Sequence, residues 1–449
     1  MRQFVRGGQT VQVPDWREAA GLFPCPDILW QGVWSEVADK TRRSWDVWAA
    51  TYCALSALAE RNLHWYYVGA PLFGMAYVLC VGPTGGNKQL PVDICETLVP
   101  ENYNKRDGVQ SGAGLFPMLV DTSSRAEVKP VRPTLMIMDE WTKLITNMTM
   151  QSSTLLDEIN SLFHRNRRWN VSRSDREGGG GDRVSQAPIL SIFGTTTPEA
   201  LLSDVSELMV NRGMLNRYLV LPAATREFEY RPKKRMSDPT ITLAPLRQEL
   251  MARLTGYKWG GGESYEDAFS EEAMALNEAW GAPLFRDLMG QNTIEANRKK
   301  RLHMYAHHIA LVSAWSKRAS RVEVEDMEMA IAVIACANRF MDWLYTNDAL
   351  PLTTVEVGDA RLEQIVRERI ADRPSYYDRG RLRESLRRQN IPLSKLRKVI
   401  DVLLSHGDIM VDPKTMKYVF KGKEEAGNTT QAPSTSTSER RNPFARPET

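Results

Sequence analysis

Four short apolar runs, separated by stretches with helical periodicity, set the pattern in the middle of the chain. The runs cover residues 76–81, 134–138, 189–193 and 218–221. None alternates cleanly between apolar and polar residues, which is typical of strands whose two faces are both covered. Helical stretches at 140–147 and 154–165 lie between them. We therefore predict that residues 76–222 form an α/β domain around a mostly parallel sheet.

The regions on either side of this domain also show helical spacing. In residues 1–75, two sets of aromatic and aliphatic positions predict two helices that pack on the domain. Residues 223–268 are rich in Pro, Gly and charge, which predicts an extended crossing segment. Residues 269–348 predict a helical lid, with a capped start at Ser270 and a later helix that begins at Val324.

A small module is expected at residues 359–421, where three helical stretches precede a hairpin, as in a winged helix. Residues 361–421 carry fifteen Lys or Arg against eight Asp or Glu, an excess of seven positive charges. Such an excess favours binding to the phosphate backbone of DNA. The basic residues of this module that we expect to contact DNA are Arg387, Arg388, Lys395, Arg397 and Lys398. Residues 424–449 are of low complexity and are predicted to be disordered.

Composition narrows the class of protein. The chain has 449 residues, enough for two or three domains, and its net charge of +3 requires any nucleic-acid surface to be local. No apolar run reaches the length of about 18 residues that a membrane span needs, and the N-terminus lacks the apolar core of a signal peptide. Five scattered cysteines without a C-x-x-C pair argue against a zinc site or disulfides. These features predict a cytoplasmic protein.

A glycine-rich stretch follows the first apolar run and precedes a helix at 90–98. Backbone N–H groups in such a turn and at a helix N-terminus bind polyphosphates, so the stretch predicts a site for ATP. The residues expected to bind the nucleotide are Gly82, Pro83, Thr84, Gly85, Gly86, Asn87, Lys88 and Gln89. Relative to the pattern G-x-x-x-x-G-K-[ST], Asn87 replaces the second glycine and Gln89 replaces the hydroxyl residue that ligates Mg²⁺.

Polar residues end two of the other predicted strands. Asp139 and Glu140 follow the run at 134–138, and we expect Asp139 to hold Mg²⁺ with Gln89 while Glu140 polarises the attacking water. Thr195 or Thr196, after the run at 189–193, is expected to sense the γ-phosphate. The alternative is that the threonines of this segment cap the helix that begins at Pro198, and capping by Thr197 is compatible with sensing by an earlier threonine.

Arginines complete the set. Arg212 and Arg217 precede the last strand, and we expect Arg217 first and Arg212 second to stabilise the transferring phosphoryl group of a neighbouring subunit. The alternative is a surface arginine paired with a local carboxylate. A basic hairpin with an aromatic residue and a glycine-rich tip is expected to grip DNA, or to be only a solvated loop. Its candidate DNA contacts are Arg165, Arg167, Arg168 and Arg173.

The order of these parts resembles a P-loop family that is common in phages, prophages and plasmids and is often described as helicase-like or primase-associated. The resemblance covers roughly residues 20–345 and rests on Phe23-Pro24, the Gly82–Lys88 loop, Asp139-Glu140, the segment from Phe193 to Glu199, and Gly213-Met214-Leu215-Asn216-Arg217. It implies a RecA-like or AAA-like ATPase core in a ring, a hexamer, that acts with other replication proteins on single-stranded or double-stranded DNA of a mobile element, in the cytoplasm of a bacterial host.

Three hypotheses follow from the sequence. The first is an ATP-driven DNA translocase or helicase, favoured by Asp139, Glu140 and Arg217. The second is a nucleotide-binding replication-initiation or assembly protein that hydrolyses ATP weakly or not at all, favoured by Gln89. The third is a packaging motor, which the lack of a carboxylate-rich nuclease region disfavours.

Overall fold

The structure is a computed structural model of the 449-residue chain, which divides into two compact units, Met1–Val355 and Glu356–Thr449. It describes residues 2–6, 9–13, 23–60, 62–67, 70–83, 88–120, 133–149, 154–163, 169–171, 182–184, 188–205, 209, 213–223, 238–259, 265–288 and 294–346, and scattered positions between 366 and 420.

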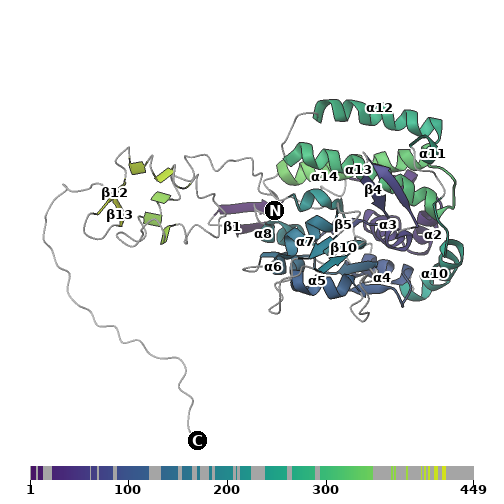
Figure 1. Cartoon of the computed structure of the whole chain (residues 1–449), viewed down its shortest axis with the longest axis horizontal. Helices are drawn as coiled ribbons and strands as arrows, with labels where there is room; N and C mark the ends of the chain where they lie inside the picture. Colours follow the sequence, from purple (N-terminus) through teal and green to yellow (C-terminus); the bar gives the residue numbers. More distant parts are fainter. Residues whose placement is uncertain are drawn as a thin grey trace, which may run out of the picture. The chain divides into compact units, whose positions relative to one another are not determined.

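A five-stranded parallel sheet forms the centre of the first unit (Figure 1). Its strand order is β11-β5-β10-β7-β6, and every neighbouring pair is parallel. The strands are β5 (Tyr77–Val81), β6 (Asn104–Arg106), β7 (Thr134–Met138), β10 (Leu190–Thr196) and β11 (Leu219–Pro222). All residues of β5, β7, β10 and β11 are buried. The prediction of an α/β domain with a mostly parallel sheet is confirmed.

Helices cover both faces of this sheet. On one face, α3 (Trp45–Ala59) packs on β5, β10 and β11, and α4 (Gln89–Leu98) packs on β7, β10 and α3. The connection from β5 to β6 runs in one direction across the sheet, and the later connections run in the other. Because parallel crossovers are right-handed, the helices of the later connections cover the opposite face. Those helices are α5 (Gly112–Leu119), α6 (Thr142–Thr149), α7 (Leu155–Leu162) and α8 (Pro198–Asp204).

The N-terminal region contains the two predicted helices, α2 (Val33–Lys40) and α3, after a short 3-10 turn η1 (Asp27–Leu29). Two hairpins flank these helices, and the apolar pattern predicts neither of them. One is formed by β1 (Arg2–Arg6) and β2 (Gln9–Val13), and the other by β3 (His64–Tyr67) and β4 (Ala70–Phe73). The expected basic hairpin is present in β8 (Trp169–Val171) and β9 (Asp182–Val184), which pair antiparallel. All five cysteines lie among the described residues and are free.

The segment after β11 differs from its prediction. An extended crossing segment was expected over 223–268, whereas Pro239–Leu254 form helix α10 and Tyr265–Ala268 form the short helix α11. Asp238 caps α10 by accepting from the Thr240 amide, and proline fits the first helical position. Four leucines spaced three or four apart are buried and pack this helix on its neighbours: Leu243, Leu246, Leu250 and Leu254.

Three long helices follow: α12 (Glu271–Leu288), α13 (Ile294–Ser316) and α14 (Val324–Thr346). The Ser270 hydroxyl accepts from the Ala273 amide, so the predicted cap at the start of α12 is confirmed. Helix α13 lies at the amino ends of the strands, because the Tyr305 hydroxyl contacts both the amide and the carbonyl of Tyr77, the first residue of β5.

The second unit is described at scattered positions. Strands β12 (Ile409–Val411) and β13 (Tyr418–Phe420) form the expected antiparallel hairpin. They share one apolar cluster with residues of the stretches predicted as helices, namely Val366, Ile370, Leu382, Leu396, Val399, Ile400 and Leu403. The winged-helix topology itself stays a prediction, and the tail at 424–449 lies outside the described residues.

Candidate functional site

Three neighbouring strands end at one edge of the sheet, and the residues that follow them form the candidate site. Val81 ends β5, Met138 ends β7 and Thr196 ends β10. The Gly82 amide donates to the Thr196 carbonyl over 3.0 Å, and the Ala223 amide donates to the Val81 carbonyl over 2.7 Å. The loop that leaves β5 is therefore held at its start by the strands on both sides of β5.

This close approach requires a glycine at position 82. A Cβ atom there would lie 2.4 Å from the Cβ of Ala223, well inside van der Waals contact. Pro83 follows and is half-buried. The remainder of the glycine-rich stretch lies outside the described residues: Thr84, Gly85, Gly86 and Asn87.

The start of helix α4 carries Lys88 and Gln89. Lys88 is half-buried and directly precedes the helix, whereas Gln89 is exposed in its first turn. The Gln89 side-chain nitrogen donates to Oδ1 of Asp93, one turn later, over 2.7 Å. Because an ionised carboxylate only accepts hydrogen bonds, the amide nitrogen must face Asp93, and the amide oxygen faces away from it.

Asp139 and Glu140 follow β7 with both side chains 60% exposed. Lys143 joins them, with its Nζ 3.6 Å from an Asp139 oxygen and 3.3 Å from a Glu140 oxygen. The hydrogen bond to Glu140 and the charge of Asp139 raise the pKa of Lys143. Lys143 is absent from our predicted site. Its spacing of three and four residues from the two acids, at a helix start, is the signal that points to it.

The threonines at the end of β10 connect this strand to β7. The buried Thr195 hydroxyl donates to the Asp139 carbonyl over 2.5 Å, and the Trp141 amide donates to the Thr195 carbonyl over 2.9 Å. The Thr196 hydroxyl donates to the Thr197 carbonyl over 3.4 Å. The capping role is carried out by Thr197, whose side chain caps α8. Thr195 thus fixes the backbone that carries the acidic pair.

Arg217 lies at the opposite edge of the sheet from Lys88. It ends the 3-10 turn η2 (Leu215–Arg217), two residues before the start of β11, and its guanidinium donates to the Gly213 carbonyl over 2.7 Å. Arg301 of α13 donates to the same carbonyl over 3.2 Å. Burial and the nearby Arg301 lower the pKa of Arg217 to about 10. Within one chain, Arg217 and Lys88 therefore do not share a site.

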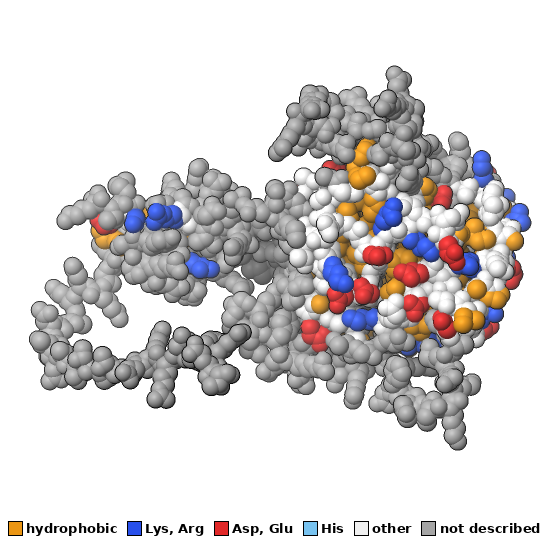
Figure 2. All heavy atoms as spheres, turned by 90° about the horizontal axis from the view of Figure 1, so that it is seen from below, with side chains coloured by type: hydrophobic (Ala, Val, Ile, Leu, Met, Phe, Trp, Pro, Cys, Tyr) orange, Lys and Arg blue, Asp and Glu red, His pale blue; other side chains and the backbone are white. Residues whose placement is uncertain are grey.

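The remaining predicted site residues are not described by the structure. Arg212 and all the candidate DNA contacts lie outside the described residues: Arg165, Arg167, Arg168, Arg173, Arg387, Arg388, Lys395, Arg397 and Lys398. Figure 2 shows acidic and basic side chains intermixed on one face of the first unit, and neither sign of charge dominates the described part of that face.

Comparison with known proteins assigns no family. No family model matches the chain, and no curated protein matches it either. Among the described residues, no three His, Cys, Asp or Glu side chains gather as a metal-binding group. None of the described helices combines the length and the apolar character that crossing a membrane requires.

Proposed function

We propose that this protein is a P-loop ATPase of the RecA-like or AAA-like kind that acts as a DNA helicase or translocase during replication of a phage or other mobile element. The observation that supports it is the strand order, which sets the tip of β10 between the loop after β5 and the acids after β7. Ligands of open α/β sheets bind outside the carboxyl ends of strands, where connections diverge to the two faces, as they do beside β5.

Each residue of this edge has a chemical role in the proposal. Lys88 neutralises the β- and γ-phosphates, and Glu140 accepts the proton of the attacking water. Thr195 acts through Asp139, because its hydroxyl holds the Asp139 carbonyl and so positions the following carboxylates. In a water-excluded site, preorganised charges of this kind lower the barrier more than flexible ones.

The donor set of this edge fits Mg²⁺, a hard cation that prefers oxygen ligands. The Asp139 carboxylate is exposed, and the Gln89 amide oxygen faces away from Asp93. These two side chains would hold the ion, which supplies charge stabilisation to phosphate oxygens when bound. A glutamine orientated in this way stands in for the serine or threonine hydroxyl of the usual motif, with Asp93 as the residue that positions it.

Arg217 serves a neighbouring copy in this proposal. Its place at the amino edge removes it from the Lys88 site of its own chain. A ring of subunits in which one amino edge faces the next carboxyl edge brings the two together. DNA contacts come from the basic hairpin and the C-terminal module, and these rest on the sequence alone.

The second candidate is a replication-initiation or assembly protein that binds ATP and turns it over weakly or not at all. One observation favours it: the Lys143 ammonium already pairs with both carboxylates, so a cation that binds between them must displace it. The helicase proposal requires that nucleotide and Mg²⁺ do so.

Steady-state ATPase activity, measured with and without single-stranded DNA, separates the two candidates. We expect turnover by the wild type that DNA stimulates, and a loss of about 10²-fold or more in Glu140→Gln with nucleotide affinity retained. Binding of a fluorescent ATP analogue without DNA-stimulated turnover in the wild type selects the second candidate. Absence of both rejects the nucleotide site.

A further inference from the structure

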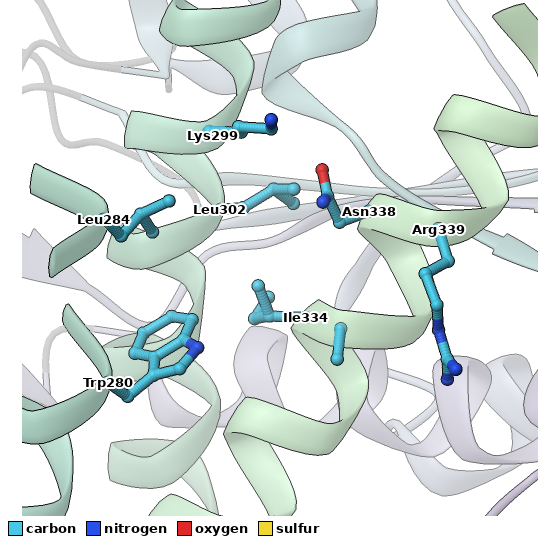
Figure 3. Close-up of a pocket in the computed structure, with 8 residues that line it drawn as sticks. Trp280, Leu284, Lys299, Leu302, Ile334, Asn338 and Arg339 are labelled. Carbon is cyan, nitrogen blue, oxygen red and sulfur yellow. The ribbon is translucent and has the colours of Figure 1, made fainter. Parts of the chain in front are cut away.

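A cavity lies among the three long helices, apart from the candidate site at the carboxyl ends of the strands. It has a volume of about 410 Å³ and is lined by residues of α12, α13 and α14 (Figure 3). Small-molecule sites in proteins begin at about 300 Å³ and are mostly apolar with a few placed polar groups. This cavity has the size and the mixture of such a site.

The floor of the cavity is apolar and rigid. Leu302 and Ile334 are buried beneath it, and Leu284 reaches in from α12. The Trp280 indole forms one wall, and its ring is stacked on His303 with centroids 5.2 Å apart and an interplanar angle of 6°. This stack fixes the indole, so an aromatic or branched aliphatic group would meet a preformed surface.

Three polar side chains at the cavity can donate hydrogen bonds to a ligand. Lys299 has three N–H donors, one of which engages Glu295 over 2.6 Å. The Asn338 oxygen accepts from buried Arg298 over 3.0 Å, which leaves its amide nitrogen as the group that can bind a ligand. The Trp280 indole N–H is a donor only, and in Figure 3 its nitrogen faces the cavity. A set made of donors, one of them cationic, selects an acceptor-rich anion.

We propose that this cavity binds a small amphipathic carboxylate, with an apolar ring or branched chain on the floor and its carboxylate between Lys299 and Asn338. The inference does not depend on the nucleotide site, since it uses other helices and other side chains. Figure 3 also provides an internal comparison. Arg339 lines the cavity with its stem while its guanidinium runs away from the other labelled side chains, so its charge does not contribute.

The test uses the full chain, with the fluorescent apolar anion 1-anilinonaphthalene-8-sulfonate as reporter and two competitors of equal size. The competitors are 4-phenylbutyrate, which carries a carboxylate, and 4-phenylbutanol, which is neutral. We expect saturable reporter binding to the wild type, and displacement by the butyrate at about tenfold lower concentration than by the butanol. Ala335→Trp, at an exposed lining position, fills the cavity and should remove the displaceable signal, with Ala335→Leu giving a partial loss.

Lys299→Met and Arg339→Met form the matched pair. We expect Lys299→Met to abolish the preference for the butyrate over the butanol, and Arg339→Met to retain it. The proposal is overturned if the wild type shows no displaceable signal, if Ala335→Trp leaves it unchanged, if the two competitors act equally on the wild type, or if both methionine variants alter the preference to the same extent. Since the assay contains no nucleotide, its outcome is independent of ATP binding.

Discussion

The two edges of the central sheet are built differently. At the carboxyl edge, the Asp139 and Glu140 side chains are 60% exposed, and each forms an ion pair with Lys143. At the amino edge, Tyr77 and Tyr305 are fully or almost fully buried, and one hydroxyl bonds several backbone groups. An edge packed against a helix contributes stability, whereas an edge with exposed carboxylates leaves those side chains accessible to a ligand.

Helix α13 holds the amino edge through more than one hydrogen bond. The Tyr305 hydroxyl also lies 2.7 Å from the Arg217 carbonyl, which joins β11 to the same point. One turn further along, Nε2 of the neutral His308 ring donates to the Phe73 carbonyl over 2.9 Å, and its Nδ1 accepts from the Tyr52 hydroxyl over 2.6 Å. The amino edge therefore connects helices α3 and α13 with strands β4, β5 and β11, and perturbations there should unfold the domain.

Acid should give the largest loss of stability. Burial lowers the pKa of His303 and His308 to about 4. Burial and the charge of the nearby His303 lower the pKa of His307 to about 3. The unfolded chain protonates these histidines near pH 6.5, so stability is intact above that pH and falls as pH decreases toward 4. By pH 5 the loss is roughly 2 kcal/mol for each histidine that stays neutral in the fold.

Urea unfolding at pH 7, 6 and 5 measures this loss. His308→Gln keeps a hydrogen-bonding side chain but does not titrate, so it should make the free energy of unfolding less dependent on pH. A free energy of unfolding that stays constant between pH 7 and 5 contradicts the buried, neutral state of these histidines.

Truncation of Tyr305 should give the second largest loss of stability. Tyr305→Ala removes a buried ring and leaves the backbone groups of Tyr77 without their partner, which costs about 3–5 kcal/mol. Tyr305→Phe keeps the ring and should cost about 1–2 kcal/mol. The midpoint of urea unfolding, followed by circular dichroism, measures both. An unchanged midpoint in Tyr305→Phe would show that the hydroxyl contributes nothing to the stability of this edge.

The sequence predicted the buried strands well, and physical reasons explain where it failed. The run at 134–138 is a strand with the predicted bounds, because four consecutive apolar residues after Thr134, in a strand with both faces covered, have few alternatives. Strand β6 (Asn104–Arg106) is three polar residues at the sheet edge and carries no apolar signal. In α10, the leucine spacing was masked by the surrounding prolines, glycines and charges.

The candidate site was predictable in its order of parts but not in its contacts. Adjacent strand ends follow from a parallel sheet, and the pairing of β10 with β5 and β7 brings Thr195 and Asp139 together. The position of Arg217 could also have been predicted from the sequence, since a residue just before a parallel strand must lie at the amino end of that strand. The contacts of Asp93 and Lys143 depend on rotamers, which the sequence does not determine.

Gly82→Ala tests the close backbone packing at the carboxyl edge. The added methyl would lie 2.4 Å from the Cβ of Ala223, and such overpacking costs about 1–3 kcal/mol. It should also weaken binding of a fluorescent ATP analogue, because the loop after β5 shifts. The double variant Gly82→Ala with Ala223→Gly removes the clashing methyl and should recover most of both losses. No recovery would place the cost of Gly82→Ala elsewhere than at Ala223.

Thr195→Val should have a smaller effect on stability and a clear one on function. It removes the hydrogen bond to the Asp139 carbonyl, which is worth about 1 kcal/mol. ATP turnover should fall about tenfold, since the acids lose their position. Thr195→Ser keeps the hydroxyl and serves as the control. If Thr195→Val changes stability but not turnover, Thr195 has only a structural role at this edge.

The smallest effect on stability is expected at Lys143, and it bears most directly on the contrast between the edges. Lys143 is 66% exposed, so Lys143→Met should leave the urea midpoint unchanged, as for most exposed ion pairs. It removes the cation that shares Asp139 and Glu140, so the Mg²⁺ concentration needed for half-maximal binding of a fluorescent ATP analogue should fall about two- to threefold. Lys143→Arg keeps the charge and should keep the wild-type requirement. A large destabilisation by Lys143→Met would mean that the exposed carboxyl edge also contributes substantially to stability. That result would contradict the contrast between the two edges.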